Sequence, residues 1–119
     1  MEKETMLSLE RLGVDTESAL ARFMNNGALY EKFLRRFVQD QNYAALTEAV
    51  REGRVQDAFA AAHTLKGVSA NLSLTRLTES VSEVVEALRA GDLEAARALM
   101  PDVEEAYREI TAFFRELPA

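Results

Sequence analysis

Residues 54–71, RVQDAFAAAHTLKGVSAN, form the stretch around which the rest of the chain can be placed. Apolar residues recur there every three or four positions, which is the period of an α-helix. One helical face is predicted to carry Ala58, Ala61, Leu65, Val68 and Leu72. His63, the only histidine of the chain, falls roughly opposite this face, and Lys66 and Gly67 lie one turn further on. We therefore expect a helix over 54–71 that buries one side and keeps an imidazole in water.

Helical periodicity continues on the N-terminal side of this stretch. Residues 1–12 are expected to form a strap or a short helix, and Asp15 is expected to cap another short helix. A broad apolar face predicts a further helix over residues 28–38. A bend at residues 40–42 precedes its continuation, which stops at Gly53.

The C-terminal half is predicted to contain two more helices. Ser73 is expected to cap the first of them, and a Gly-Asp pair at residues 91–92 ends it and caps the next. The last helix carries an apolar stripe from Val103 to Leu117 with regular helical spacing. Pro101 interrupts its early part, so we expect either a kink there or a new helix with the proline in its first turn.

Helices of this length, joined by turns of two or three residues, run antiparallel to their neighbours. Because each carries one apolar stripe, the sequence predicts an all-α protein, an antiparallel up-down four-helix bundle with a short extra N-terminal helix. We assign residues 1–12 to the N-terminal strap or helix and residues 13–119 to the bundle domain. Aromatic side chains are expected to dominate the core, namely Phe33, Phe37, Phe113 and Phe114.

The chain has 119 residues, a formal net charge of −6, one histidine and no cysteine. The length fits one domain. Without cysteine there is no disulfide or thiol chemistry, and a single histidine argues against a transition-metal site, so we expect no metal and no cofactor. Scattered basic residues argue against nucleic acid as a partner. No apolar run approaches the roughly 20 residues that cross a bilayer, so we expect a cytoplasmic monomer without a membrane partner.

The surroundings of His63 indicate which chemistry its imidazole can perform. Lys66 lies three residues along on the same face, and Gly67 leaves space above the ring. Phe59 and Ala70 add a small or apolar surface. A nucleophilic role needs only an accessible imidazole that accepts and releases a group, and a phosphoryl group suits a neighbouring ammonium. Hydrolysis would need a cleft, an orienting carboxylate and an oxyanion hole, which a helix surface does not offer.

Each of these features also has a purely structural explanation. Lys66 can be ordinary solvated surface, Gly67 can allow a neighbouring helix to approach closely, and Phe59 can be partly buried. A lone histidine on a helix is usually surface decoration. Their combination is what favours a functional site.

The segment from Ala62 to Gly67 reads A-H-x-L-K-G, through Ala62, His63, Leu65, Lys66 and Gly67. It resembles the histidine-containing phosphotransfer (HPt) domains of two-component phosphorelays, and the resemblance covers about residues 13–117. It implies an antiparallel four-helix bundle in which His63 is the phosphoacceptor, most often through Nε2. It also implies that Lys66 assists phosphate binding and that Gly67 gives the partner access.

Two positions depart from the family pattern. The glycine that usually follows the histidine by ten residues is Ser73 here, which should be tolerated if Ser73 caps the next helix. Many members also place a glutamine or glutamate near the imidazole on that helix, and ungapped counting puts this position near Val85. Arg89 lies on roughly the same flank and could offer a second positive charge to phosphate. The residues expected to act in docking or in a secondary role are Phe59, Ala70, Ser82, Val85 and Arg89.

The resemblance implies a phosphorelay intermediate, a phosphocarrier without autonomous catalytic activity. It would accept a phosphoryl group on His63 and pass it to or from an aspartate of a receiver domain. The expected partners are receiver domains of response regulators, hybrid sensor histidine kinases, or both. The alternative is a helical protein-interaction scaffold in which His63 is not phosphorylated. A histidine-kinase dimerisation module is disfavoured, because such modules usually place an acidic residue where Thr64 stands here.

Overall fold

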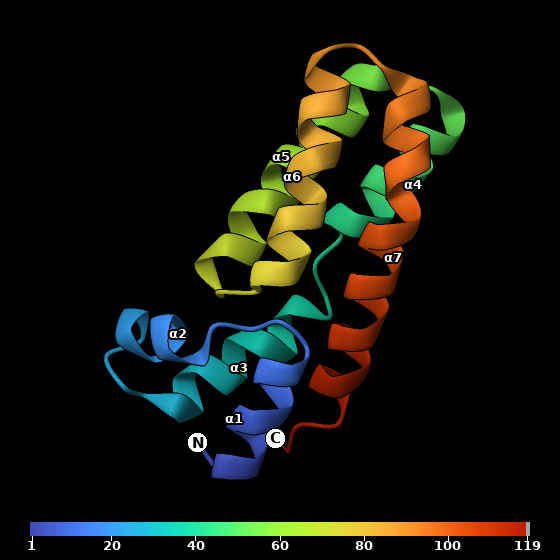
Figure 1. Ribbon diagram of the computed structural model, residues 1–119. Coiled ribbons are helices and arrows are strands. Elements are labelled where there is room, and N and C mark those ends of the chain that lie inside the picture. The colour runs from blue at the N-terminus through green and yellow to red at the C-terminus, as the bar shows by residue number, and fades with distance from the viewer. Residues whose placement is uncertain (119) are drawn as a thin grey trace.

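The computed structural model describes residues 1–118, and seven helices account for the regular structure of these residues (Figure 1). The helices are α1 (Lys3–Arg11), α2 (Thr16–Arg22), α3 (Gly27–Phe37), α4 (Asn42–Glu52), α5 (Val55–Asn71), α6 (Thr75–Arg89) and α7 (Leu93–Arg115). No strand occurs within this range, so the all-α prediction is confirmed. Ala119, the last residue assigned to the bundle domain, lies outside the described residues, and the division at residue 13 stays a prediction.

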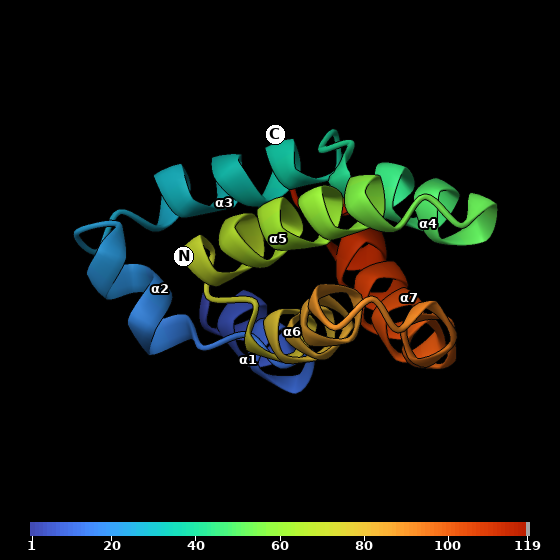
Figure 2. The same cartoon turned by 90° about the horizontal axis from the view of Figure 1, so that it is seen from above.

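The four C-terminal helices form an antiparallel bundle. α5 packs between α4 and α6, α6 packs against α7, and α4 meets α7 to close the ring (Figure 2). Their apolar stripes meet in a core of fully buried side chains that includes Leu46, Leu65, Val81 and Val103. Each buried leucine or valine stabilises the fold by about 1.5–3 kcal/mol. This shared core holds α5, the helix that carries His63, in a fixed orientation.

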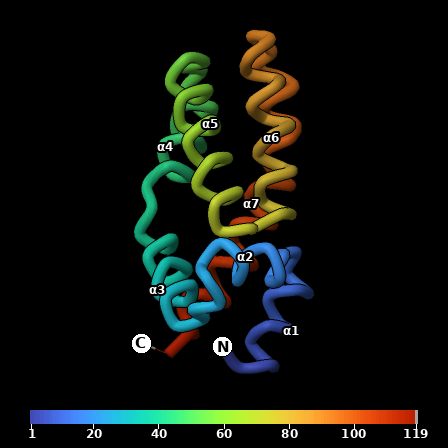
Figure 3. The backbone as a smooth tube through the Cα atoms, turned by 90° about the vertical axis from the view of Figure 1, so that its left-hand side faces the viewer, coloured from blue at the N-terminus to red at the C-terminus, as the bar shows by residue number. Residues whose placement is uncertain are grey.

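The three N-terminal helices lie at one end of the bundle, where the C-terminal half of α7 extends past α4 (Figure 1). α3 packs on α7 and α2 packs on α3, below the corner between α5 and α6 (Figure 3). The molecule is therefore elongated, 42 Å long and 22 × 20 Å across.

The bend predicted at residues 40–42 is a full break between α3 and α4. The Asp40 carboxylate accepts hydrogen bonds from the backbone N–H and the side-chain amide of Asn42, at 2.8 and 2.9 Å. A short polar side chain that bonds the backbone two residues on competes with the helix at this point. The chain consequently leaves α3 and begins a new helix at Asn42.

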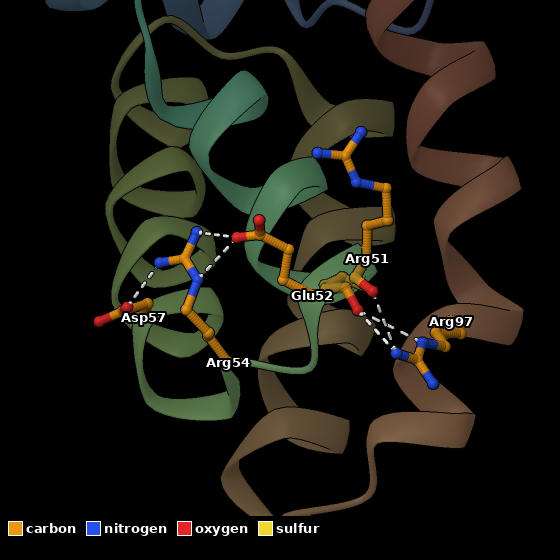
Figure 4. Close-up of polar contacts among 6 residues, drawn as sticks. Arg51, Glu52, Arg54, Asp57 and Arg97 are labelled. Carbon is orange, nitrogen blue, oxygen red and sulfur yellow. Dashed lines mark hydrogen bonds and ion pairs between the residues drawn. The ribbon is translucent and has the colours of Figure 1, made fainter.

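The turn between α4 and α5 is held by contacts on both sides (Figure 4). Arg97 of α7 donates hydrogen bonds to two backbone carbonyls in the last turn of α4, at 3.1 and 3.4 Å. Gly53 follows α4 with a φ of +75°, in the left-handed region that favours glycine. Arg54 then pairs with Glu52 at 2.8 Å and with Asp57 at 2.7 Å. These contacts set where α5 begins.

The turn between α5 and α6 differs from the prediction. Ser73 does not cap α6, because the N-cap residue is Leu74 and no side chain bonds the first turn. Ser73 instead has a φ of +59°. Its N–H donates to the carbonyl of Ala70, and the N–H of Leu74 donates to the carbonyl of Ser69. This pair of bonds is a Schellman motif, whose left-handed position favours glycine.

The last helix continues through its proline. α7 runs without interruption over Leu93–Arg115 with Pro101 inside it. The expectation of a new helix that starts at the proline is therefore wrong. Buried residues on both sides of the proline, Ala96 and Val103, anchor the helix to the core although the proline contributes no N–H.

The aromatic core was predicted only in part. Phe37 and Phe114 are buried and their ring centres lie 6.2 Å apart, while Phe113 is partly buried. Phe33 is 37% exposed, so its place in the predicted core is wrong. The buried stripe of α3 instead includes Tyr30, which is fully buried, and Phe33 falls beside that stripe.

Candidate functional site

The middle of α5 has one buried and one exposed side. The buried residues are Ala58, Ala61, Ala62, Leu65 and Ser69. On the opposite side His63 and Gly67 are exposed, and Lys66 is partly buried. The apolar face holds the helix against the bundle, and the imidazole consequently projects into solvent.

The His63 ring is stacked on an aromatic neighbour from the preceding turn. The rings of Phe59 and His63 are nearly parallel, with an interplanar angle of 14° and centres 6.0 Å apart. The guanidinium carbon of Arg89, from α6, lies 5.1 Å from the centre of the same phenyl ring. Arg89 also pairs with Glu86 at 3.3 Å. The Phe59 ring therefore contacts both the imidazole and a cation from the adjacent helix.

Lys66 supplies a second positive charge one turn from His63. Within residues 1–118, no carboxylate lies within ion-pair distance of its ammonium. The sequence between Asp57 and Glu79 contains no acidic residue at all. Lys66 is therefore the one charged residue of α5 after Asp57, on a chain whose net charge is −6. A cation in this position attracts anions to this part of the helix.

Gly67 stands in open space. A Cβ atom placed on this residue would meet no atom within 4 Å, so no neighbouring helix approaches it closely. The purely structural explanation for this glycine therefore fails. A glycine inside a helix costs about 1 kcal/mol relative to alanine. No close contact of the fold therefore requires a glycine at position 67.

The residues expected in secondary roles occupy different environments. Ala70 is partly buried, and its carbonyl accepts a 3.0 Å hydrogen bond from Arg22. Ser82 is partly buried, and its hydroxyl donates to the carbonyl of Thr78 at 2.7 Å. Val85 is fully buried in the core, so the expectation that it takes part in docking is wrong. Ungapped counting gives a position along α6 but not the side of the helix that it faces, and α6 turns residue 85 toward the core.

Two further residues beside the site were missed from the sequence. Arg22 comes from α2, 48 residues away from the carbonyl that it contacts, and no local pattern predicts such a pair. Glu86 could have been found, because it precedes Arg89 by three residues on the same helix. Pairs with this spacing meet on a helix surface.

An apolar groove borders α5 on the side of α3. Val68 and Asn71 of α5 line it together with Phe33 and Phe37 of α3, around a volume of about 420 Å³. Arg36 also lines the groove, and its guanidinium carbon lies 5.5 Å from the Phe33 ring centre. The groove therefore combines exposed aromatic surface with a positive charge.

Among residues 1–118, no three or more histidine, cysteine, aspartate or glutamate side chains cluster as metal ligands would. None of the helices in this range has the length and apolar character that crossing a membrane requires.

Comparison with known proteins identifies the family. The family model described as Hpt domain matches residues 29–113, from α3 to the end of α7, a range that includes the exposed side of α5. A search of curated proteins found no match, and a search of solved structures found none either. The matched range covers well over half of the chain. The chain therefore belongs to the Hpt domain family, whose members are phosphocarrier modules of phosphorelays.

Proposed function

We propose that the chain accepts a phosphoryl group on His63 and passes it to or from an aspartate of a receiver domain. The observation that carries this proposal is the exposed imidazole with the Lys66 ammonium one turn along and open space at Gly67. This arrangement suits a second protein better than a small substrate. We expect the protein to act in the cytoplasm as a monomer, without catalytic activity of its own. Its partners would be receiver domains, hybrid sensor kinases, or both.

Phosphoryl transfer to His63 requires from this chain only a nucleophilic nitrogen. A neutral imidazole with its proton on Nδ1 carries a lone pair on Nε2, which attacks the phosphorus of an aspartyl phosphate. A P–N bond forms as the P–O bond to the aspartate breaks, and the carboxylate leaves with the bonding electrons. The ring then carries the Nδ1 proton as a phosphoimidazolium, which can release that proton to water. The reverse step returns the phosphoryl group to an aspartate carboxylate.

Lys66 is the proposed stabiliser of the phosphoryl oxygens. Residues three apart on a helix have Cβ atoms about 5–6 Å from each other. The flexible stem of lysine lets the ammonium reach a group on His63. Hydrogen bonds from a cation to phosphate oxygens are roughly twice as strong as neutral ones. Arg89 would add a second cation from α6, since both it and His63 contact Phe59.

Gly67 is proposed to admit the partner's surface. A receiver aspartate must come into line with the imidazole nitrogen, and a side chain at this position would stand between the two proteins. Phe59 and Ala70 flank the same side of α5, while the groove lined by Phe33 offers apolar area. Arg36, which also lines this groove, would place a positive charge opposite the acidic site of the partner.

The test is labelling of the protein by a phosphorylated receiver domain. His63→Gln should abolish acid-labile labelling while its helical circular dichroism stays that of the parent. Thr64→Ala is the matched control, because the Thr64 hydroxyl bonds back to the carbonyl of Ala60 at 3.0 Å and faces its own helix. The control should be labelled like the parent. Label on the His63→Gln protein would end the phosphocarrier proposal.

The alternative of an interaction scaffold predicts a different pair of results. A scaffold would bind its partner with equal affinity before and after His63→Gln and would carry no phosphoryl group in either form. Measuring binding and labelling on the same two proteins separates the two functions.

A further inference from the structure

We propose that Glu86 sets how firmly the protein holds its phosphoryl group, by competing with that group for the guanidinium of Arg89. This inference rests on the proposed phosphorylation of His63. It adds a residue outside the segment from Ala62 to Gly67 that carries the family resemblance, one position after Val85, where ungapped counting places the family's glutamine or glutamate. Glu86 would be a positioning residue that acts through Arg89.

Arg89 has two partners in the unphosphorylated protein. Its Nε lies 3.3 Å from one carboxylate oxygen of Glu86 and 3.4 Å from the other. Its guanidinium carbon also lies 5.1 Å from the centre of the Phe59 ring. The phenyl ring in turn stacks on His63. Arg89 thus contacts the aromatic neighbour of His63, while its hydrogen bonds go to Glu86.

The ion pair between Glu86 and Arg89 is weak enough for Arg89 to change partners. The side chains of Arg89 and Glu86 are 56% and 63% exposed. Exposed pairs of this kind contribute little net stability, because water screens them and both side chains lose freedom. Both hydrogen-bond distances are also long for a charge-assisted contact. A stronger acceptor nearby would therefore take the guanidinium.

A phosphoryl group on His63 is such an acceptor. It carries up to two negative charges and three oxygens, against one charge and two oxygens on Glu86. A guanidinium binds oxygens of this kind with two parallel N–H donors. Stacking on a phenyl ring uses the face of the guanidinium and leaves its N–H edges available. Phosphorylation would move the hydrogen bonds of Arg89 from Glu86 to the phosphoryl oxygens, with Phe59 keeping the side chain in reach.

Glu86 would lower the stability of the phosphorylated state in two ways. It offers Arg89 an alternative partner, and its own negative charge opposes the phosphoryl charge nearby. Removing the charge of Glu86 should consequently make Arg89 more available and the phosphohistidine longer lived. With Glu86 present, the protein would hold the phosphoryl group less tightly and release it to an acceptor more easily.

The experiment phosphorylates the protein with phosphoramidate, a small donor that needs no partner protein. The hydrolysis half-life of the phosphohistidine is then measured for the parent, Glu86→Gln, Arg89→Gln and the double variant. Glu86→Gln should lengthen the half-life about two- to threefold, which is the range expected from releasing one exposed ion pair. Arg89→Gln should shorten the half-life, and adding Glu86→Gln to it should change nothing further. The side-chain Nε–H signal of Arg89 should also shift in the NMR spectrum on phosphorylation.

Glu83→Gln is the matched control for charge. Glu83 is exposed one turn before Glu86 on the same helix, but it lines a pocket with Ser80 and with Asp102 of α7, on the side away from α5. Its replacement should leave the half-life unchanged. An equal effect from Glu83→Gln would overturn the proposal, and so would an effect of Glu86→Gln that persists without Arg89. Failure of the proposed function would show separately, as a phosphoramidate-labelled protein that exchanges nothing with receiver domains.

Discussion

The hydroxyl of Tyr30, in α3, donates a 2.6 Å hydrogen bond to the backbone carbonyl of Leu72, at the end of α5. Both residues are buried. The bond joins the N-terminal helices to the corner that follows the His63 helix, across 42 residues of sequence. Together with the bond from Arg22 to the carbonyl of Ala70, it links α1–α3 to the C-terminal end of α5.

Replacing Tyr30 by phenylalanine tests the strength of this link. The variant keeps the ring in the core but leaves a buried carbonyl without a donor, so the free energy of unfolding should fall by about 1–2 kcal/mol. Urea unfolding followed by circular dichroism measures it. Tyr43→Phe is the control, because Tyr43 is only partly buried and keeps its stacking on Tyr107, and it should change stability much less. Equal losses in the two variants would contradict the role of the Leu72 contact.

The same tyrosine should make the fold sensitive to alkali. Burial raises the pKa of Tyr30 well above its ordinary value, and the charge of Asp15 acts in the same direction. An unfolded tyrosine ionises near pH 10, whereas the folded one stays protonated. The stabilising contribution is therefore complete below about pH 10 and is lost as the pH rises further.

We expect the free energy of unfolding to decrease above about pH 10 in the parent and to decrease less steeply in Tyr30→Phe. Burial also raises the pKa of Tyr43 and Tyr107, so some slope should remain in the variant. Urea titrations at a series of alkaline pH values measure both slopes. Identical slopes would show that Tyr30 ionises equally in the folded and unfolded states.

Ser73→Gly should stabilise the protein. Ser73 has a φ of +59°, where any residue with a Cβ atom is strained. Its hydroxyl donates only one side-chain hydrogen bond, to Ser18 at 3.2 Å, so little is lost with it. We expect a gain of about 0.5–1 kcal/mol in the free energy of unfolding. Ser73→Ala keeps the Cβ atom and should bring no gain, so a rise in both variants would point to another cause.

Sequence periodicity was sufficient to locate the helices and the exposed side of α5, because burial of one stripe decides how a helix is rotated. It could not place Phe33, since a broad apolar face on α3 leaves several residues competing for the core. It could not show the left-handed backbone at Ser73, because serine is common at helix starts and rare at such helix ends. The contacts of Arg22 with Ala70 and of Arg89 with Phe59 depend on how separate helices pack, which no local pattern contains.

Lys66→Ala should affect the phosphorylated state and leave the fold alone. The ammonium of Lys66 pairs with no carboxylate of residues 1–118, so the free energy of unfolding should change by less than about 0.5 kcal/mol. The phosphohistidine should hydrolyse faster, or the transfer from a receiver should slow, because a cation beside the phosphoryl oxygens is lost. Lys66→Arg keeps the positive charge, so its phosphohistidine half-life and transfer rate should stay close to those of the parent. Parental kinetics in Lys66→Ala would remove this residue from the proposed site.

Gly67 offers the sharpest separation between folding and function. A Cβ atom would fit there without contact, so Gly67→Ala should raise the free energy of unfolding by about 0.5–1 kcal/mol. Gly67→Gln should also be at least as stable as the parent, since glutamine is a good helix former.

Transfer from a phosphorylated receiver should nevertheless slow as the side chain at position 67 grows, because the added atoms stand where the partner must approach His63. Labelling by phosphoramidate should stay unchanged, since a small donor needs no such approach. Receiver transfer at the parental rate in Gly67→Gln would mean that the partner docks elsewhere and that this glycine serves neither fold nor access.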